Sequence, residues 1–198
     1  STSVFGRLSY SFDDRYFLTA SLRRDASSKL WKDNNYGIFP AFSASWKISS
    51  EPFFASLRPT INLLKVRGSW GQIGNNNLVP RYSYNVPMGR APWQAYYGKD
   101  LQTEARGVYQ TSISNKKLKW ETTEQTGIGL DIALLNNRFS FSADYFHKLT
   151  KDLIERIPIT PTAGIETEPY GNIGKVLNKG WEFSAKYNQS FNKIDFNI

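Results

Sequence analysis

The chain has 198 residues, enough for one sizeable domain, and a formal net charge of +8. Because it contains no Cys, we expect neither disulfide bonds nor a thiolate metal site. The Lys and Arg residues are dispersed over strand faces and turns instead of forming one block, so composition does not favour nucleic-acid binding. No apolar run approaches the roughly 18 residues of a membrane helix. A transmembrane barrel is not excluded, because it exposes only every second residue to lipid.

Alternation of apolar and polar residues predicts three strands within the first fifty positions, at 4–12, 16–23 and 38–48. A short turn at Asp13-Asp14 separates the first two strands, and a polar loop at 25–35 separates the second from the third. A connector at 49–60, containing Pro52, is expected to hold one short helical turn. A fourth strand follows at 64–70.

The residues from Gly71 to Lys117 form the longest stretch without a clear period, rich in Gly, Asn, Pro and aromatic residues. We expect an irregular region there, with one further strand near 108–113. The loop at 155–171 is also long and contains three prolines. A strand at 181–187, a turn at 188–193 and the start of a last strand complete the chain.

The stretch at 118–154 carries the clearest signal, because two long alternating runs meet at Asn136-Asn137, residue types that close tight hairpins. Each run exceeds ten residues, whereas strands of ordinary globular proteins cluster at about five or six. Such length suits strands that cross a membrane at a tilt. The apolar phase contains Trp120, Ile128, Leu130, Ile132 and Leu134, then Phe139, Phe141, Ala143 and Tyr145.

The links between strands alternate between short and long, as in outer-membrane barrels with short periplasmic turns and long extracellular loops. We therefore predict an all-β fold, an antiparallel transmembrane barrel segment of about eight strands. A soluble β-sandwich also has regular strands and polar turns, but it predicts neither strands this long nor two alternating classes of loop.

Catalytic chemistry is not indicated. His147, the only histidine, lies in the apolar phase, whereas Ser140 and Ser142 lie in the opposite phase of the same strand and point away from it. The Asp13-Asp14 pair fits a turn, and the spacing of acidic residues at 25–35 matches no metal motif. We expect no enzymatic activity, no bound metal and no cofactor.

Two groups of residues are candidates for contact with a ligand or a partner. In the loop segment APWQAYYG, the aromatic rings could stack on sugar rings, contact a partner or pack on one another; they are Trp93, Tyr96 and Tyr97. On the strands, the polar phase predicts a set of residues that face a barrel lumen: Lys65, Arg67, Gln125, Asp131, Asp144, Glu182 and Lys186.

Several segments resemble the SusC/RagA family of TonB-dependent outer-membrane transporters of the Bacteroidota, in the expected order and over almost the whole chain. They are FGRLSYSFDDRYFLTASLRRDASSKL, GNNN, LKWETTEQTGIGLD, NNRFSFSADYFHKLTKDLI and NIGKVLNKGWEFSA. The resemblance implies that residues 1–198 form the later part of a barrel of 22 strands around a plug domain. It also implies that the signal peptide, TonB box and plug lie outside this sequence.

The same resemblance implies a function and partners. Family members import oligosaccharides or peptides across the outer membrane, with a SusD-like surface lipoprotein as a lid and with energy delivered through TonB. The partners expected are therefore that lipoprotein, TonB through parts outside this sequence, the substrate and outer-membrane lipid, but no nucleic acid. Two alternatives remain at this point: a soluble or surface-anchored β-sandwich that binds glycans, and a complete eight-stranded barrel with a structural role.

Overall fold

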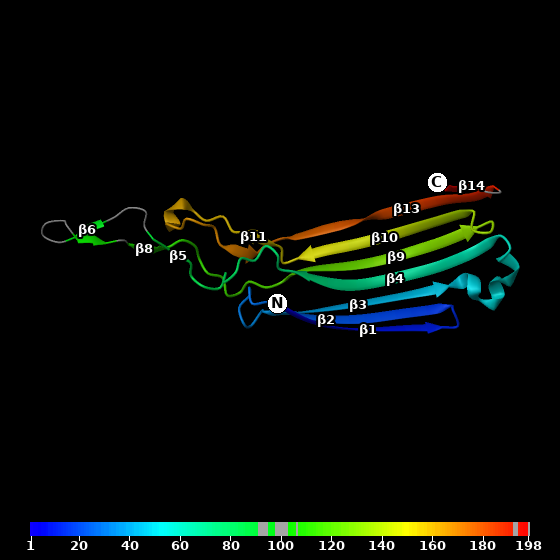
Figure 1. Ribbon diagram of the computed structural model, residues 1–198, viewed down its shortest axis with the longest axis horizontal. Helices are drawn as coiled ribbons and strands as arrows, with labels where there is room; N and C mark the ends of the chain where they lie inside the picture. Colours follow the sequence, from blue (N-terminus) through cyan, green and yellow to red (C-terminus); the bar gives the residue numbers. More distant parts are fainter. Residues whose placement is uncertain (91–94, 98–102, 106, 192–193, 198) are drawn as a thin grey trace.

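The computed structural model describes the backbone of residues 1–90, 95–97, 103–105, 107–191 and 194–197, and the side chains of 1–90 and 107–189. Eight antiparallel strands form one sheet in the order β1-β2-β3-β4-β9-β10-β13-β14 (Figure 1). The strands are β1 (Thr2–Phe12), β2 (Tyr16–Ala26), β3 (Tyr36–Lys47), β4 (Ile61–Asn75), β9 (Glu121–Leu134), β10 (Phe139–Lys151), β13 (Lys175–Phe191) and β14 (Ile194–Asn197).

The two predicted tight turns are confirmed. Asp13 and Asp14 both have φ of 50°, and Asn136 and Asn137 have φ of 57° and 63°. Asp and Asn tolerate this left-handed region, which matches the twist of the flanking strands. The second turn also includes Leu135 at φ 52°, a residue type that the sequence did not single out.

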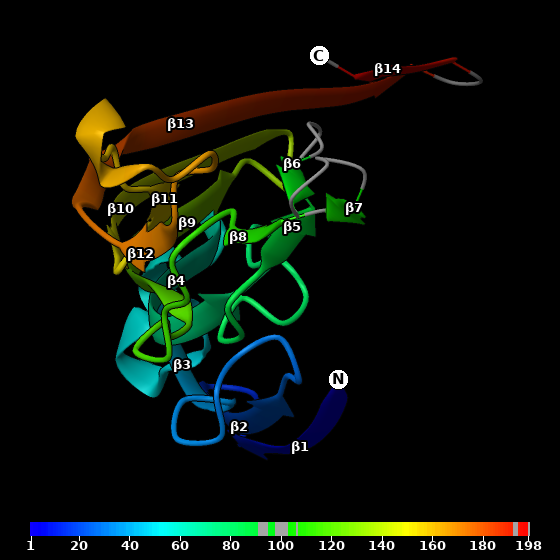
Figure 2. The ribbon, with the colours of Figure 1, turned by 90° about the vertical axis from the view of Figure 1, so that its left-hand side faces the viewer.

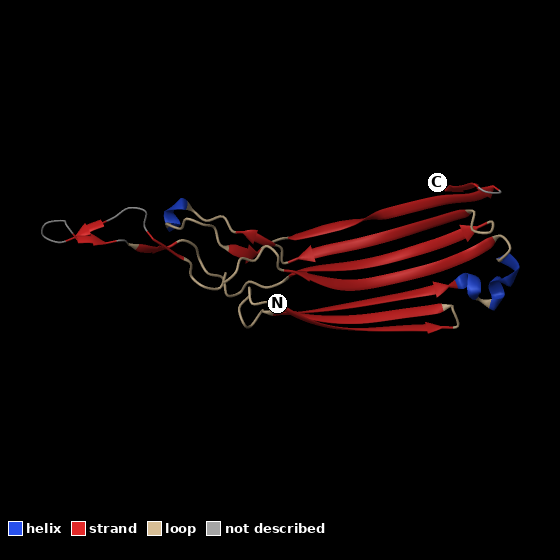
Figure 3. Cartoon of the chain, in the orientation of Figure 1, coloured by secondary structure: helices blue, strands red, loops and turns tan. Residues whose placement is uncertain are grey.

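The links fall into two classes at opposite ends of the sheet, as predicted. The short links lie at one end (right in Figure 1), and the long loops lie at the other. The 49–60 connector forms two 3₁₀ helices, η1 (Ile48–Ser50) and η2 (Pro52–Leu57), whereas η3 (Pro161–Ala163) lies among the long loops (Figure 3). In the described ranges, none of the helices is both long and apolar enough to cross a membrane.

The region expected to be irregular contains more strand than predicted. β4 continues to Asn75, and beyond it β5 (Met88–Arg90) pairs with β8 (Val108–Gln110), while β6 (Ala95–Tyr97) pairs with β7 (Thr103–Ala105). These two ladders form a narrow arm that projects away from the sheet at its loop end (Figure 1). The 155–171 loop is bounded by a further short pair, β11 (Ile154–Arg156) and β12 (Tyr170–Asn172).

A small apolar core lies among the long loops and not under the sheet. Leu30, Val79, Leu118 and Ile154 are each at most 3% exposed. Leu30, Val79 and Leu118 come from three links between strands, and Ile154 begins β11; Trp120 and Tyr170 pack against them. These loops therefore form one packed cap, which we call the loop cap.

The arrangement of the sheet bears on two hypotheses drawn from the sequence, the β-sandwich and the complete eight-stranded barrel. Seen from the loop end, the strands follow an open arc (Figure 2). Among the described residues no second sheet packs against the eight strands, so the β-sandwich hypothesis is not favoured. In the same residues β1 pairs only with β2 and β14 only with β13, so these eight strands do not close on themselves.

Candidate functional site

The two faces of the sheet differ in chemistry. Because strand residues alternate between faces, the register places most large apolar residues of the main strands on one face and the charged cluster around Arg67 on the other. The apolar face is exposed, with Leu8 at 72% and Phe183 at 68%. Exposed apolar patches of this extent do not face water in a stable monomer.

The apolar band crosses the strands obliquely. One row of opposed residues contains Tyr10, Leu18, Ala44, Gly68, Ile128, Tyr145 and Trp181. On β1 and β3 the band continues from this row toward the loops, as far as Val4 and Ile38. On β10 and β13 the row of His147 and Lys179 interrupts the band on the loop side, and the band continues toward the turns as far as Phe139 and Tyr187. Strands tilted by about 35–45° in a bilayer require such an oblique band.

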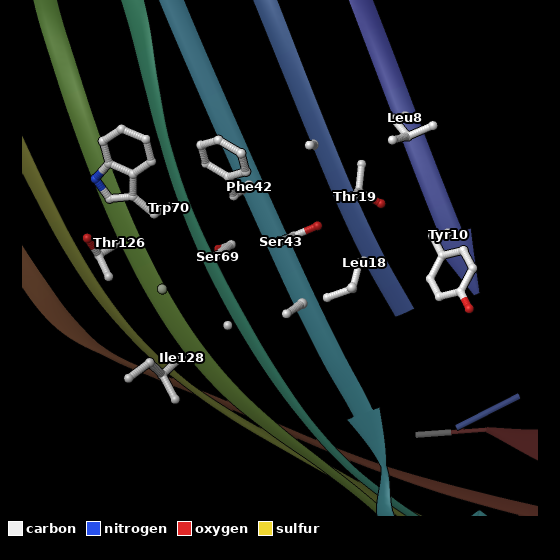
Figure 4. Close-up of a pocket in the computed structure, with 14 residues that line it drawn as sticks. Leu8, Tyr10, Leu18, Thr19, Phe42, Ser43, Ser69, Trp70, Thr126 and Ile128 are labelled. Atoms are coloured by element: carbon white, nitrogen blue, oxygen red, sulfur yellow. The ribbon is translucent and has the colours of Figure 1, made fainter. Parts of the chain in front are cut away.

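A shallow groove of about 650 Å³ runs across the apolar face over β1, β2, β3, β4 and β9. Small residues form its floor at Ala20, Ala44 and Gly68. Phe42 and Trp70 stand beside each other on one side, with ring centroids 6.1 Å apart, and Leu18 lies near Tyr10 on the other (Figure 4). The groove has almost no polar surface, so it suits an acyl chain better than a soluble ligand.

The polar face is organised around Arg67. Its Nε and Nη2 donate to the two carboxylate oxygens of Asp131 at 3.0 and 3.2 Å, and Nη2 also donates to Asp144 at 2.7 Å. The three residues come from β4, β9 and β10, so one guanidinium connects three strands. Paired hydrogen bonds to a carboxylate fix the guanidinium plane more firmly than a single contact.

Gly129 makes this arrangement sterically feasible, and no feature of the sequence singles it out. It lies directly between Arg67 on β4 and Asp144 on β10 in the register. A Cβ at this position would overlap the Asp144 carboxylate and lie 2.8 Å from Arg67 Cζ. The missing side chain therefore lets Arg67 cross β9 and reach a carboxylate two strands away.

The structure places all seven predicted polar residues on this one face. Lys65 lies opposite Asp131, and Glu182 lies opposite Asp144, so five of the seven form one mixed-charge cluster. Gln125 lies nearer the loops, and Lys186 lies opposite Ser140 nearer the turns. That this face lines a lumen stays a prediction.

Two of the three predicted aromatic candidates lie on the projecting arm. Trp93 lies outside the described residues. Tyr96 and Tyr97 belong to β6, whose backbone is described but whose side chains are not. Their contact with substrate or partner remains a prediction.

Hydrogen bonds tie the base of the arm and the long loops into the loop cap. Tyr109 donates to Glu166 at 3.0 Å, and this carboxylate raises the pKa of the tyrosine. Asn172 accepts from Lys119 N at 2.8 Å and donates to Lys119 O at 3.0 Å. Asn115 Nδ2 donates to Tyr170 O at 2.9 Å. The cap thus has defined polar contacts as well as an apolar core.

No catalytic constellation forms around His147. It lies opposite Thr126 and Lys179 on the apolar face, while Ser140 and Ser142 belong to the other face. Two of the acidic side chains weighed as metal ligands are bound to cations: Asp14 accepts from Lys47 at 2.6 Å and Asp25 from Arg23 at 2.7 Å.

Long, tilted antiparallel strands with an exposed apolar band on one face and a charged network on the other define the wall of a transmembrane β-barrel. Over residues 1–198 the sequence matches the family described as TonB dependent receptor-like, beta-barrel. The chain therefore belongs to this family, and it forms part of the barrel of an outer-membrane protein.

Individual relatives agree with the family. The chain is 36% identical over 182 residues to TonB-dependent receptor P3 of Formosa agariphila, and 34% identical over 188 residues to TonB-dependent receptor SusC of Bacteroides thetaiotaomicron. Each match covers 92% of this chain, but only 17% and 18% of the relatives' lengths. The RagAB peptide importer in its closed-closed state matches with a TM-score of 0.81 and 26% identity, over 96% of this chain and 20% of that one.

Proposed function

We propose that this chain is part of the wall and the extracellular loops of an outer-membrane transporter that imports oligosaccharides or peptides, energised through TonB. The observation that carries the proposal is the match of the whole chain to the TonB-dependent receptor family, together with the structural likeness to a peptide importer. We also propose that the transporter works with a SusD-like lipoprotein as its lid.

The polar face fits the lumen side of such a wall. Its cluster joins positive Lys65 and Arg67 with negative Asp131, Asp144 and Glu182, so it binds water and polar groups without attracting one sign of charge strongly. Such a surface lets a hydrated substrate pass, and it offers ion-pair partners to a plug inside the barrel.

The loop cap and its arm fit the capture of substrate or contact with the lid. The cap is held by its own apolar core, so it presents a defined surface beyond the sheet. The arm carries Tyr96 and Tyr97, and Trp93 is near them in the sequence; aromatic rings of this kind suit stacking on sugar rings or packing against a partner protein. The protein needs no catalytic residue for this activity, and we propose that it is not an enzyme.

Uptake by cells that carry the full-length transporter tests the proposal. Cells lacking its gene should fail to take up a labelled oligosaccharide or peptide, and the gene should restore uptake only when TonB is present. Uptake that continues without TonB, or absence of any effect on both substrate classes, would refute the import function.

The contribution of the arm to substrate capture is tested in a separate experiment. A triple substitution of Trp93, Tyr96 and Tyr97 by Ala should lower uptake at least about tenfold, since each lost stacking contact is worth about 0.5 kcal/mol or more. Tyr36→Ala, an exposed tyrosine at the start of β3 and off the arm, is the matched control. Equal uptake by the triple variant and the control would remove the arm from substrate capture and leave the import function standing.

A further inference from the structure

We propose that the loop-side margin of the apolar band on β10 and β13 binds the phosphate-bearing head group of an outer-leaflet lipid. The site consists of His147, Lys151, Lys175 and Lys179, which we call the basic rim. The inference does not depend on which nutrient is imported.

The register brings the four residues together on the lipid-facing side of the sheet. His147 lies directly opposite Lys179, and Lys151 lies directly opposite Lys175. Between these two pairs lies an apolar pair, Leu149 opposite Leu177, the latter 50% exposed. The rim is thus a small surface with cations at two levels and an apolar strip between them.

The aromatic margin of the bilayer lies immediately below the rim. Tyr145 and Trp181 occupy the next row toward the turns, with ring centroids 5.1 Å apart. Tyr and Trp at the edge of an apolar band mark the level of the lipid head groups. The cations one row beyond them therefore lie where lipid phosphates are found.

The charges of the rim are only partly balanced by the protein. Glu124 accepts from Lys151 at 3.0 Å and from Trp70 at 3.1 Å. Nearby Asp152 pairs with Lys119 at 3.0 Å. Within the described part of the chain, neither Lys175 nor Lys179 forms an ion pair. Lys175 also lies directly opposite Lys151, and like charges opposite each other on neighbouring strands repel and destabilise the pairing.

A bound anion between these side chains would remove the repulsion. An amphiphilic anion fits the surface better than a free one, because its acyl chains would lie over Trp181 and Tyr145 while its phosphate meets the lysines. Long Lys side chains extend toward the head-group region from an apolar surface in the same way. Chemistry and position together favour a phosphate-bearing glycolipid or phospholipid of the outer leaflet.

Lipid retention by the full-length transporter tests the site. The protein is reconstituted in nanodiscs of phosphatidylcholine with and without lipid A, and retained lipid A is measured by mass spectrometry. K175Q combined with K179Q should lower the affinity for lipid A about fivefold per lysine. K175R combined with K179R keeps both charges and should retain the lipid.

The matched control is K148Q combined with K186Q. These lysines lie on the same two strands and are also exposed, but they belong to the polar face, so the control should retain lipid A as the unmodified protein does. Heat-modifiable gel mobility verifies that each variant is folded. Equal retention by the K175Q/K179Q variant and the unmodified protein, or equal loss in the control, would overturn the proposal. If inorganic phosphate alone bound to the protein as tightly as lipid A does, the proposal would also be overturned, in favour of a site for a free anion.

Discussion

Arg67 on β4 reaches Asp144 on β10 across the full width of β9, with its Nη2 2.7 Å from the carboxylate. The contact links two strands that do not pair with each other, and it exists because β9 carries Gly129 between them. The same guanidinium holds Asp131 through two hydrogen bonds, so the three strands share one charged group. On a polar face without an apolar core beneath it, such a connection keeps neighbouring strands in register.

Gly129→Ala is expected to break this connection. The added methyl group occupies the space through which Arg67 passes, and the resulting overlap lowers the free energy of unfolding by about 1–3 kcal/mol. Urea titration of the folded full-length protein in lipid vesicles, followed by gel mobility, measures the change. Gly127→Ala is the control on the same strand and face, where the nearest atom to a new Cβ is Ser69 Oγ at 3.2 Å. Equal urea midpoints for Gly129→Ala and Gly127→Ala would show that the passage of Arg67 across β9 does not contribute to stability.

Phe39→Ala is expected to destabilise the loop end of the sheet. The Phe39 ring is only 7% exposed; it covers Gly37 and Gly74 and meets Trp120 with centroids 5.7 Å apart. An aromatic ring over strand glycines replaces the packing that they lack, so its removal should cost about 3–5 kcal/mol. Phe42→Ala, three residues further along β3 and 55% exposed on the apolar face, should cost about 1 kcal/mol in the same titration. A smaller loss for Phe39 than for Phe42 would contradict this account.

The sheet could be predicted from the sequence because period-two alternation determines strand, face and turn together. The polar phase selected Arg67, Asp131 and Asp144 correctly as residues of one face, since a strand residue has only two sides to occupy. Their mutual contact could not be predicted, because it depends on the register of three strands and on the absence of a side chain at Gly129. From the sequence alone, a glycine that a strand merely tolerates cannot be distinguished from one that the packing of neighbouring side chains requires.

The loops were predicted less well, for a physical reason. Leu30, Val79 and Leu118 lie in three links and Ile154 begins β11, and no periodicity marks them as members of one core. The arm was read as irregular because its strands have three residues each, too few for alternation to be visible. Contacts between distant segments are visible only in the folded chain.

The short-turn end should respond to acid through Glu51, which lies between η1 and η2 and is 6% exposed. It accepts from Tyr16 Oη at 2.7 Å, from Trp46 Nε1 at 3.0 Å and from Arg15 at 3.2 Å. The hydrogen bond from Tyr16, followed by those from Trp46 and Arg15, lowers the pKa of this carboxyl in the folded state. The unfolded chain therefore binds the proton more readily than the folded one.

It follows that this carboxylate stabilises the protein above its ordinary pKa of about 4.3, and that the contribution is lost as pH falls through the lowered folded pKa. Glu51→Gln should therefore unfold at a lower urea concentration than the unmodified protein near pH 7, and the difference should shrink as the medium is acidified. Glu155→Gln, an exposed carboxyl in the loop cap, is the control and should show no such trend. If the difference in urea midpoint between Glu51→Gln and the unmodified protein were the same at every pH, Glu51 would stabilise the fold through its packing and not through its charge.

Ile154→Ala should loosen the loop cap and leave the barrel wall intact. Ile154 is 1% exposed and packs with Leu118, Val79 and Leu30, so its truncation leaves a cavity that costs the cap about 2–5 kcal/mol. The sheet is stabilised by its strand ladder and by lipid, and gel mobility of the variant should stay that of a folded barrel. Faster proteolysis or hydrogen exchange in the loops at 76–84 and 115–120 is the expected readout. Ile173→Ala, 42% exposed at the end of β12, should leave both measurements unchanged. Unchanged loop protection in Ile154→Ala would show that hydrogen bonds such as that between Asn115 and Tyr170 hold the cap without its apolar core.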